Sequence, residues 1–266
     1  MAEGPFRRVV LLCDPACDIR LAVGDAATLA GRLGAALLGI FVDDENLHRF
    51  AGLPFGQYVS LSSGTLTEAL TAANFEALSS ALGAGMKRAL AQIAEEQGLQ
   101  CTFVSIRDLP SAAVLSHEEG DILVIETAAR AFSGTWRPRS AWEKGPDQFS
   151  GSVLLKGRNV GRDGMVIVLP TEENEREKVL AASAAIATGD EDMVVVGRQA
   201  DLGASEKILA ARLKASQRAR IKCVPLDDRS HLASFIVNRK PALVVLRAAE
   251  AAALSDGVNA DVLLVR

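Results

Sequence analysis

The 266-residue chain has few aromatic residues, only four cysteines and no long apolar run. Four cysteines in a chain of this length do not make the disulfide framework that holds small secreted domains together. No stretch approaches the roughly 18 apolar residues of a membrane span. The apolar run after Arg8, residues 9–13, is too short for a secretory signal. We therefore expect a cytoplasmic protein without a membrane partner.

Basic residues are not in excess either, because 29 Lys and Arg stand against 33 Asp and Glu, for a net charge of −4. Proteins that bind nucleic acid usually carry a basic excess, so we expect no nucleic-acid partner. Apolar residues make up 49% of the chain and charged residues 23%, which is typical of a globular protein with a buried core. Ala, Leu and Val supply most of the apolar content, which suits helices packed closely on a sheet.

What the chain does have is an approximate internal repeat. The segment RRVVLLCDPA near the start has the same pattern as DGMVIVLPTE, which begins at residue 163. Later, GDILVIETAARA corresponds to KPALVVLRAAEA, and SGSVLLKG corresponds to NADVLLVR. The repeat predicts two domains, residues 1–157 and 164–266, with a boundary in the Gly-rich and charged segment 156–164.

Within each half, short apolar runs alternate with helical patterns. Helices are expected over 19–33, from a capping box at Thr65–Glu68 to Gln97, and over 110–119, 172–187, 204–217 and 230–239. The strands are too apolar to alternate between two faces, which indicates a parallel sheet with helices on both sides. The predicted fold class is therefore α/β, with two tandem Rossmann-like domains. Two inserts, 43–64 and 127–150, are expected to be long loops.

These features resemble the universal stress protein family in its tandem, two-domain form. The resemblance is carried by VVLLCDPA with Asp14 at its end, by LLGIFVDD and GDILVIE, and by the closing strands SVLLK and DVLLVR. It implies a five-stranded parallel sheet in each half, in the order 3-2-1-4-5. It also implies that any ligand lies at the carboxyl ends of strands one and four. Because a closing strand in this family commonly pairs across a dimer, self-association as a homodimer is expected.

One motif of that family is absent from the sequence. Members that bind ATP have a loop G-x2-G-x9-G-[ST] after the fourth strand, whose backbone amides hold the phosphates. Here the fourth strand of the first half continues into ETAAR, residues 126–130, and that of the second half into RAAEAAALSDG. Side chains at these positions would crowd a backbone that must approach phosphates closely. The sequence therefore predicts no cofactor held in the standard way.

Five residues remain candidates for a variant nucleotide pocket. By the resemblance, Asp14 would reach the nucleoside and Val42 would lie near the adenine. Asp14 could instead cap the helix that follows it, and the missing glycines favour that interpretation. Gly151 and Ser152 match the closing Gly-Ser of the motif but directly precede the fifth strand, so a turn is favoured over a phosphate contact. Arg130 could bind an anion in place of the glycine amides.

Arg130 belongs to a segment rich in arginine and tryptophan, which also contains Arg137, Arg139, Trp136 and Trp142. The tryptophans could stack on a base. Arginine and aromatic residues are also the usual anchors of protein interfaces. We favour a packed loop that covers an edge or contacts a protein partner.

No catalytic or metal-binding set stands out. Cys13 and Cys17 are separated by three residues rather than by the two of a CxxC pair, and no nearby histidine completes a zinc set. His48, His117 and His231 belong to no Ser-His-Asp order or HExxH motif. We therefore expect no catalytic residues and no metal.

The leading hypothesis is a non-enzymatic stress-response or regulatory protein that acts through protein contacts. The alternative is an adenine-nucleotide sensor that binds ATP or AMP in a variant pocket at Asp14, Val42 and the segment from Arg130 to Ser152. A weak ATPase is a third and less favoured hypothesis.

Overall fold

A computed structural model describes most of the chain. The described residues are 6–15, 17–53, 71–108, 118, 120–126, 151–156, 164–170, 173–187, 191–226, 231–253 and 260–266. Nearly all of the expected helix over 110–119, the whole insert 127–150 and residues 157–163 lie outside them.

The elements follow one another in the same general order in both halves. The first half contains β1 (Arg8–Cys13), α1 (Ile19–Leu33), β2 (Ala36–Asp44), α2 (Glu45–Ala51), α3 (Ala72–Gln97), β3 (Cys101–Asp108), β4 (Asp121–Glu126) and β5 (Ser152–Lys156). The second half contains β6 (Met165–Leu169), α6 (Glu173–Ile186), β7 (Asp192–Gly197), α7 (Gln199–Arg212), α8 (Ala215–Arg218), β8 (Ile221–Pro225), α9 (Leu232–Arg239), β9 (Leu243–Arg247), the 3-10 helix η4 (Ala248–Ala253) and β10 (Asp261–Val265).

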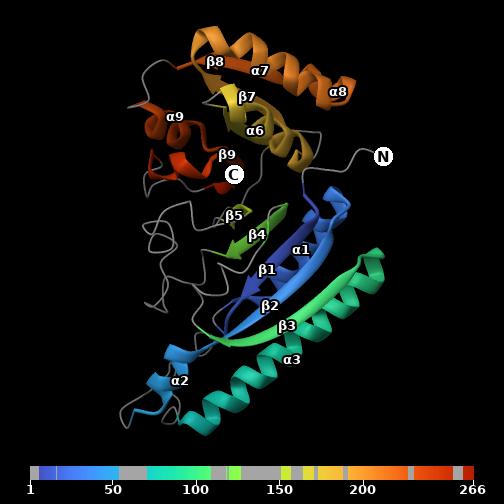
Figure 1. Cartoon of the computed structure of the whole chain (residues 1–266), viewed down its shortest axis with the longest axis vertical. Helices are drawn as coiled ribbons and strands as arrows, with labels where there is room; N and C mark the ends of the chain where they lie inside the picture. Colours follow the sequence, from blue (N-terminus) through green and yellow to red (C-terminus); the bar gives the residue numbers. More distant parts are fainter. Residues whose placement is uncertain are drawn as a thin grey trace.

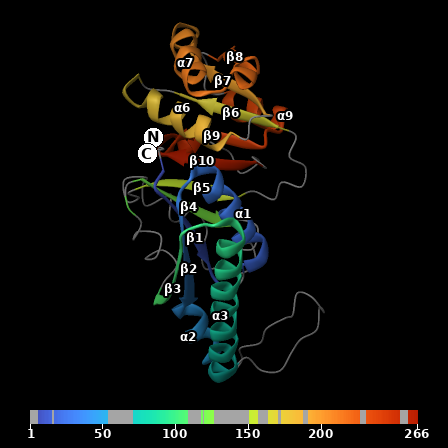
Figure 2. The same ribbon diagram turned by 90° about the vertical axis from the view of Figure 1, so that its right-hand side faces the viewer.

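The ten described strands form one continuous sheet, in the order β3-β2-β1-β4-β5-β10-β9-β6-β7-β8 (Figure 1). Read from each outer edge inward, each half has the order 3-2-1-4-5, which is the order that the family resemblance implied. All neighbouring strands are parallel except β5 and β10, which pair antiparallel at the centre. The two halves therefore lie one beyond the other along the sheet, as Figure 2 shows from the side.

The inner strands are apolar along most of their length because the sheet is buried there on both faces. Val9, Leu11 and Cys13 belong to one core cluster, while the alternating Val10 and Leu12 belong to the other. The first cluster includes residues of α1, α3, α6 and α7. Residues of α9 belong to the second. Helices therefore cover both faces of the second half, as the pattern predicted.

Helix boundaries follow local capping. The expected helix 19–33 is confirmed as α1, but its N-cap is Asp18, whose carboxylate accepts from the Leu21 amide at 3.2 Å. The hypothesis that Asp14 caps this helix is therefore wrong. Helix α3 ends at Gln97 as expected and begins at Ala72 with Thr71 as its N-cap, whereas the expected capping box at Thr65–Glu68 lies outside the described residues. A hydroxyl that accepts from the third amide of the helix stabilises such a start by about 1 kcal/mol.

Two further expectations are corrected. The insert 43–64 is not a loop throughout, because β2 continues to Asp44 and residues 45–51 form α2. The Asp44 carboxylate accepts from the Asn46 amide at 2.9 Å and so starts this helix at the end of the strand. In the second half, α7 begins at Gln199, five residues earlier than expected, and ends at Arg212 before the short α8.

A group of charged residues holds the two halves together beside the central strand pair. Lys156 of β5 lies 2.7 Å from a carboxylate oxygen of Asp261 in β10 and 3.1 Å from one of Asp25 in α1. The lysine side chain is only 12% exposed, so this contact is poorly screened by solvent. One sheet and one ion triad span both halves. The domain limits 1–157 and 164–266 stay a prediction.

None of the described helices has both the length and the apolar character needed to cross a membrane.

Helix α3 packs very closely on β2 because glycines leave room between them. A Cβ atom added at Gly39 would overlap Cδ1 of Leu90 and would lie 3.1 Å from Cε of Met86. A Cβ atom added at Gly83 would lie 3.1 Å from a ring carbon of Phe41. Leu90, Met86 and Phe41 are all at most 1% exposed, so an added Cβ atom would press on side chains that are already packed. Gly83 therefore permits close packing and does not interrupt the helix.

This packing predicts that Gly39→Ala destabilises the protein by about 1–3 kcal/mol, the usual cost of overpacking a core. The matched control is Gly85→Ala in α3, where an added Cβ meets nothing within 4 Å. The control should be neutral or should gain up to about 1 kcal/mol from helix propensity. Urea unfolding of both variants measures the two free energies. Equal effects of the two substitutions would contradict the packing argument.

Candidate functional site

The carboxyl ends of β1 and β4 were the predicted position of a nucleotide. Asp14 follows β1 there and is only 5% exposed. Its carboxylate lies 3.4 Å from the Cys17 thiol, which is also buried. Val42 is fully buried on β2, within the core cluster that includes Leu12 and Ile125. Asp14 therefore lies at the predicted edge of the sheet, whereas Val42 is a core residue.

Gly151 and Ser152 lie at the opposite end of the strands from Asp14. Ser152 begins β5 and pairs with Ile122 at the start of β4, while the β1 residue Leu12 pairs with Ile125 at its end. At about 3.3 Å per residue, this register separates Ser152 from Asp14 by roughly 16 Å along the strands. The structure therefore does not bring the Gly-Ser pair to the nucleotide position. Arg130 lies outside the described residues, so its role stays a prediction.

A second cluster, which we call the Asp43 cluster, consists of Asp43, His48, Glu76, Ser79 and Arg107. It lies at the carboxyl ends of β2 and β3, next to the start of α3. The parallel register pairs Asp43 of β2 directly with Arg107 of β3. Helix α2 contributes His48, and α3 contributes Glu76 and Ser79. Five side chains from four elements therefore meet at one end of the sheet.

Asp43 is the centre of this cluster. Its Oδ1 lies 2.6 Å from Nε2 of His48 and also accepts from the hydroxyl of the buried Ser79. Its Oδ2 accepts from Nε of Arg107 at 2.8 Å. Both oxygens of a largely buried carboxylate are thus hydrogen-bonded, as a buried charge requires.

Glu76 completes the cluster on the exposed side. Arg107 donates to both of its carboxylate oxygens at 2.7 Å. The other ring nitrogen of His48, Nδ1, lies 3.6 Å from Oε2 of Glu76. The imidazole also packs edge-on against Phe75, with ring centroids 4.7 Å apart. His48 therefore lies between two carboxylates and an aromatic ring, which fixes α2 against α3.

The residue types in this cluster could serve as metal ligands or as an ionic clamp. Asp43, His48 and Glu76 offer ligand atoms that lie within 4.8 Å of one another, and zinc accepts such nitrogen and oxygen donors. Arg107, however, already supplies a positive charge to both carboxylates. The Ser, His and Asp do not form a catalytic triad, because Ser79 and His48 both contact Asp43 and not each other. The arrangement is that of an ionic clamp.

Burial raises the pKa of Asp43, but hydrogen bonds from Ser79, His48 and Arg107 outweigh it, so that the pKa lies below its ordinary value. A carboxyl group whose pKa is lowered by folding stabilises the protein above its unfolded pKa. That contribution is lost as the pH falls through the folded pKa. Asp43 therefore stabilises the native state at neutral pH and ceases to do so in acid.

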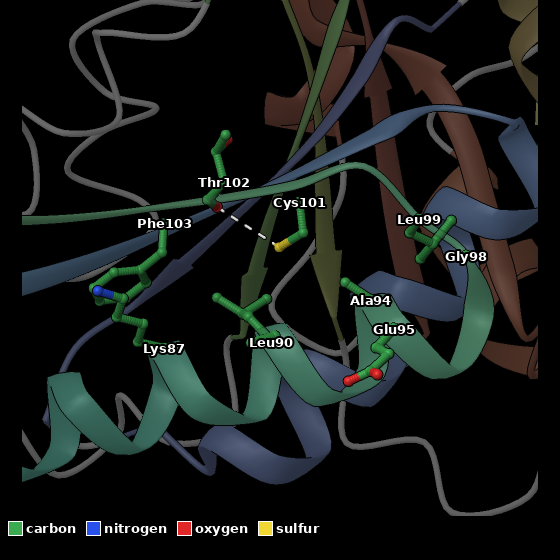
Figure 3. A pocket seen from close by; sticks show the side chains of 10 residues that line it. Lys87, Leu90, Ala94, Glu95, Gly98, Leu99, Cys101, Thr102 and Phe103 are labelled. Atoms are coloured by element: carbon green, nitrogen blue, oxygen red, sulfur yellow. Dashed lines mark hydrogen bonds between the residues drawn. The ribbon is translucent and has the colours of Figure 1, made fainter.

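Two open hollows lie between α3 and the strands under it. The larger, of about 580 Å³, adjoins the Asp43 cluster and is lined by Phe41, Asp43, Ser79, Ser80, Gly83, Ala84, Phe103, Ser105 and Arg107. The smaller, of about 370 Å³, is lined mainly by apolar groups and contains Cys101 (Figure 3). Burial raises the pKa of the Cys101 thiol, which suits a packing residue more than a nucleophile. Phe103 lines both hollows, so they lie next to each other beside β3.

Sequence reasoning missed the Asp43 cluster because its members are far apart in the chain. The signal that could have found it is the pair of polar strand ends, Asp43-Asp44 and Arg107-Asp108. Adjacent parallel strands bring such ends to the same edge of a sheet. The sequence predicts His48 within a long loop, whereas the structure places it in α2.

We predict that Asp43→Asn lowers the free energy of unfolding at pH 7 by roughly 1–3 kcal/mol. This is the usual cost when buried hydrogen-bonding groups lose a charged partner. The difference from the unchanged protein should shrink as the pH falls below the ordinary pKa of an aspartate, about 3.9, because Asp43 becomes protonated as the pH passes its lowered pKa. Urea unfolding at several pH values measures this.

Asp192→Asn is the matched control for that experiment. The pKa of Asp192 is also lowered, by its hydrogen bond to Lys222, but both side chains are solvent-exposed. Exposed pairs contribute little to stability, so this variant should behave like the unchanged protein at neutral pH. An Asp43→Asn variant of unchanged stability at pH 7 would refute the clamp.

Comparison with known proteins bears on the fold. No family model matches the sequence, and no curated protein matches it either. Among solved structures, a universal stress protein from Archaeoglobus fulgidus DSM 4304 is similar over 97% of this chain and 96% of its own, with a TM-score of 0.58 and 10% sequence identity. The match spans both halves. The chain therefore has a universal-stress-protein-like fold over nearly its whole length.

Proposed function

We propose that the protein is a non-enzymatic regulatory protein of the universal stress protein type, which acts through protein contacts and does not hold ATP in the standard way. The observation that supports this most is the position of Ser152. The residue pair that would close a phosphate loop begins β5 and faces the amino ends of the strands, far from Asp14. A phosphate-binding loop needs both groups at the carboxyl edge.

The second half supports the same proposal. Its fourth strand, β9, is followed at once by η4, an alanine-rich 3-10 helix without glycine. The last residue of β9, Arg247, lies 2.5 Å from Glu175 of α6, so an ion pair occupies this part of the carboxyl edge. Residues that lie in a helix and carry side chains cannot bring their backbone amides as close to a phosphate as the glycines of a loop can.

An adenine-nucleotide sensor is the second candidate, and one observation favours it. The carboxylate of Asp14 lies at the carboxyl end of β1, next to β4, where doubly wound sheets bind ligands. In that case the segment from Arg130 would have to supply the anion contacts that the glycines supply elsewhere. ATP or AMP would be the ligand.

We predict that ATP, ADP and AMP do not bind to the purified full-length chain at concentrations up to the millimolar range, and that no phosphate is released from ATP. Native mass spectrometry and isothermal titration calorimetry measure binding. Micromolar binding that is lost in Asp14→Ala and kept in the matched variant Ser152→Ala would overturn the proposal in favour of the sensor. Loss of binding in Ser152→Ala would show that the Gly-Ser pair contacts the ligand.

A further inference from the structure

The two ends of the described sheet differ in how their strand edges are protected. β8 is a short strand that ends at Pro225, and its Lys222 forms an ion pair with Asp192. Short length, lysine and proline are the usual means of preventing an edge from pairing with another strand. β3 has eight residues and contains neither lysine nor proline. At β3 (Figure 1), the sheet therefore ends without such protection.

The side chains of β3 are accessible on both faces. Thr102, Val104 and Ser105 are exposed, and Val104 is 45% exposed although its neighbours on β2 are deeply buried. An exposed β-branched residue in the middle of a long edge strand marks a site for strand pairing or aggregation. The two hollows beside α3 are also lined by residues of this strand, among them Thr102, Phe103 and Ser105.

Residues of β3 alternate between bonding to β2 and facing the open edge, and one hydrogen bond shows which residues do which. The amide of Leu37 donates to the carbonyl of Gln100 at 2.8 Å. In a parallel ladder, alternate residues bond to the same neighbour, so Thr102, Val104 and Ile106 direct their backbone groups toward β2. The N–H and C=O groups of Phe103 and Ser105 are then directed toward the open edge.

We infer that a second copy of this chain pairs with β3 in an antiparallel manner, about a two-fold axis at Val104. In this register Phe103 and Ser105 of one copy exchange backbone hydrogen bonds with Ser105 and Phe103 of the other, because these residues have the outward groups. Val104 faces Val104 of the second copy as a non-hydrogen-bonded pair, with Cβ atoms about 4.5–5.5 Å apart. The result is a continuous sheet through both copies.

The edge fits a second copy because it is complementary to itself. Its charged residues, Arg107 and Asp108, lie at one end, so antiparallel pairing keeps the like charges of the two copies apart. The apolar Val104 falls at the centre, where pairing buries it. Arg107 is already paired with Asp43 and Glu76 within its own chain. The chain also joins its own halves in this way, through the antiparallel pair of outer strands β5 and β10.

Ser105→Pro tests the inference on the full-length chain. The Ser105 amide faces the open edge, so proline there removes an intermolecular donor and leaves the ladder to β2 intact. We expect sedimentation velocity to show concentration-dependent dimers for the unchanged protein and for the matched variant Ser105→Ala, and monomers for Ser105→Pro. Monomers of the unchanged protein at every concentration up to millimolar, or dimers of a folded Ser105→Pro, would overturn it.

Val104→Cys provides a second test that does not depend on proline being tolerated. In the proposed pairing, the cysteines at position 104 of the two copies face each other across the two-fold axis. They are close enough to form a disulfide after a small shift of the strands. We expect air oxidation to give a covalent dimer of this variant. The control is Val237→Cys on α9, where the parent side chain is similarly exposed, at 41%. Dimer formation no greater than that of the control would exclude the Val104-centred pairing.

Discussion

The edges of the strands carry backbone N–H and C=O groups that need partners, and the structure depends on how each edge is satisfied. At the centre, β5 and β10 satisfy one another and turn two five-stranded units into a single sheet. The Lys156 triad lies beside this junction and adds charge pairing across it. At one end, β8 is short and ends at a proline. The remaining edge, β3, is long and accessible. Because the two ends differ in this way, we expect association at β3 and not at β8.

Much of the fold could be predicted from the sequence because local patterns determine it. Strands buried on both faces give short apolar runs, so the segment SVLLK was expected as a strand and is β5 at its observed bounds. Helix α1 was also expected at its observed bounds. The start of α3 was harder to predict, because Thr65 and Thr71 are equally suitable N-cap residues by residue type. The helix that follows Asp44 was missed because it is only seven residues long and is held largely by contacts from distant elements.

The candidate sites were harder to predict, for a geometric reason. Asp14 was found because it ends an obvious strand, but Ser152 was grouped with it on motif order alone, and the strand register separates them. Conversely, Asp43, Glu76 and Arg107 are separated by 33 and 31 positions in the sequence and converge only through the pairing of β2 with β3 and the packing of α3. A local pattern cannot specify such convergence. Register and helix placement must be known first.

Hydrogen–deuterium exchange of the full-length chain, followed at low and high protein concentration, tests the central role of the strand edges most directly. We expect the amides of β5 and β10 to exchange as slowly as those of β1 and β4, at every concentration. We also expect the amides of β3 to exchange more slowly when the protein is concentrated, while those of β8 do not change. Rapid exchange in β5 and β10, or exchange in β3 that is independent of concentration, would contradict that role.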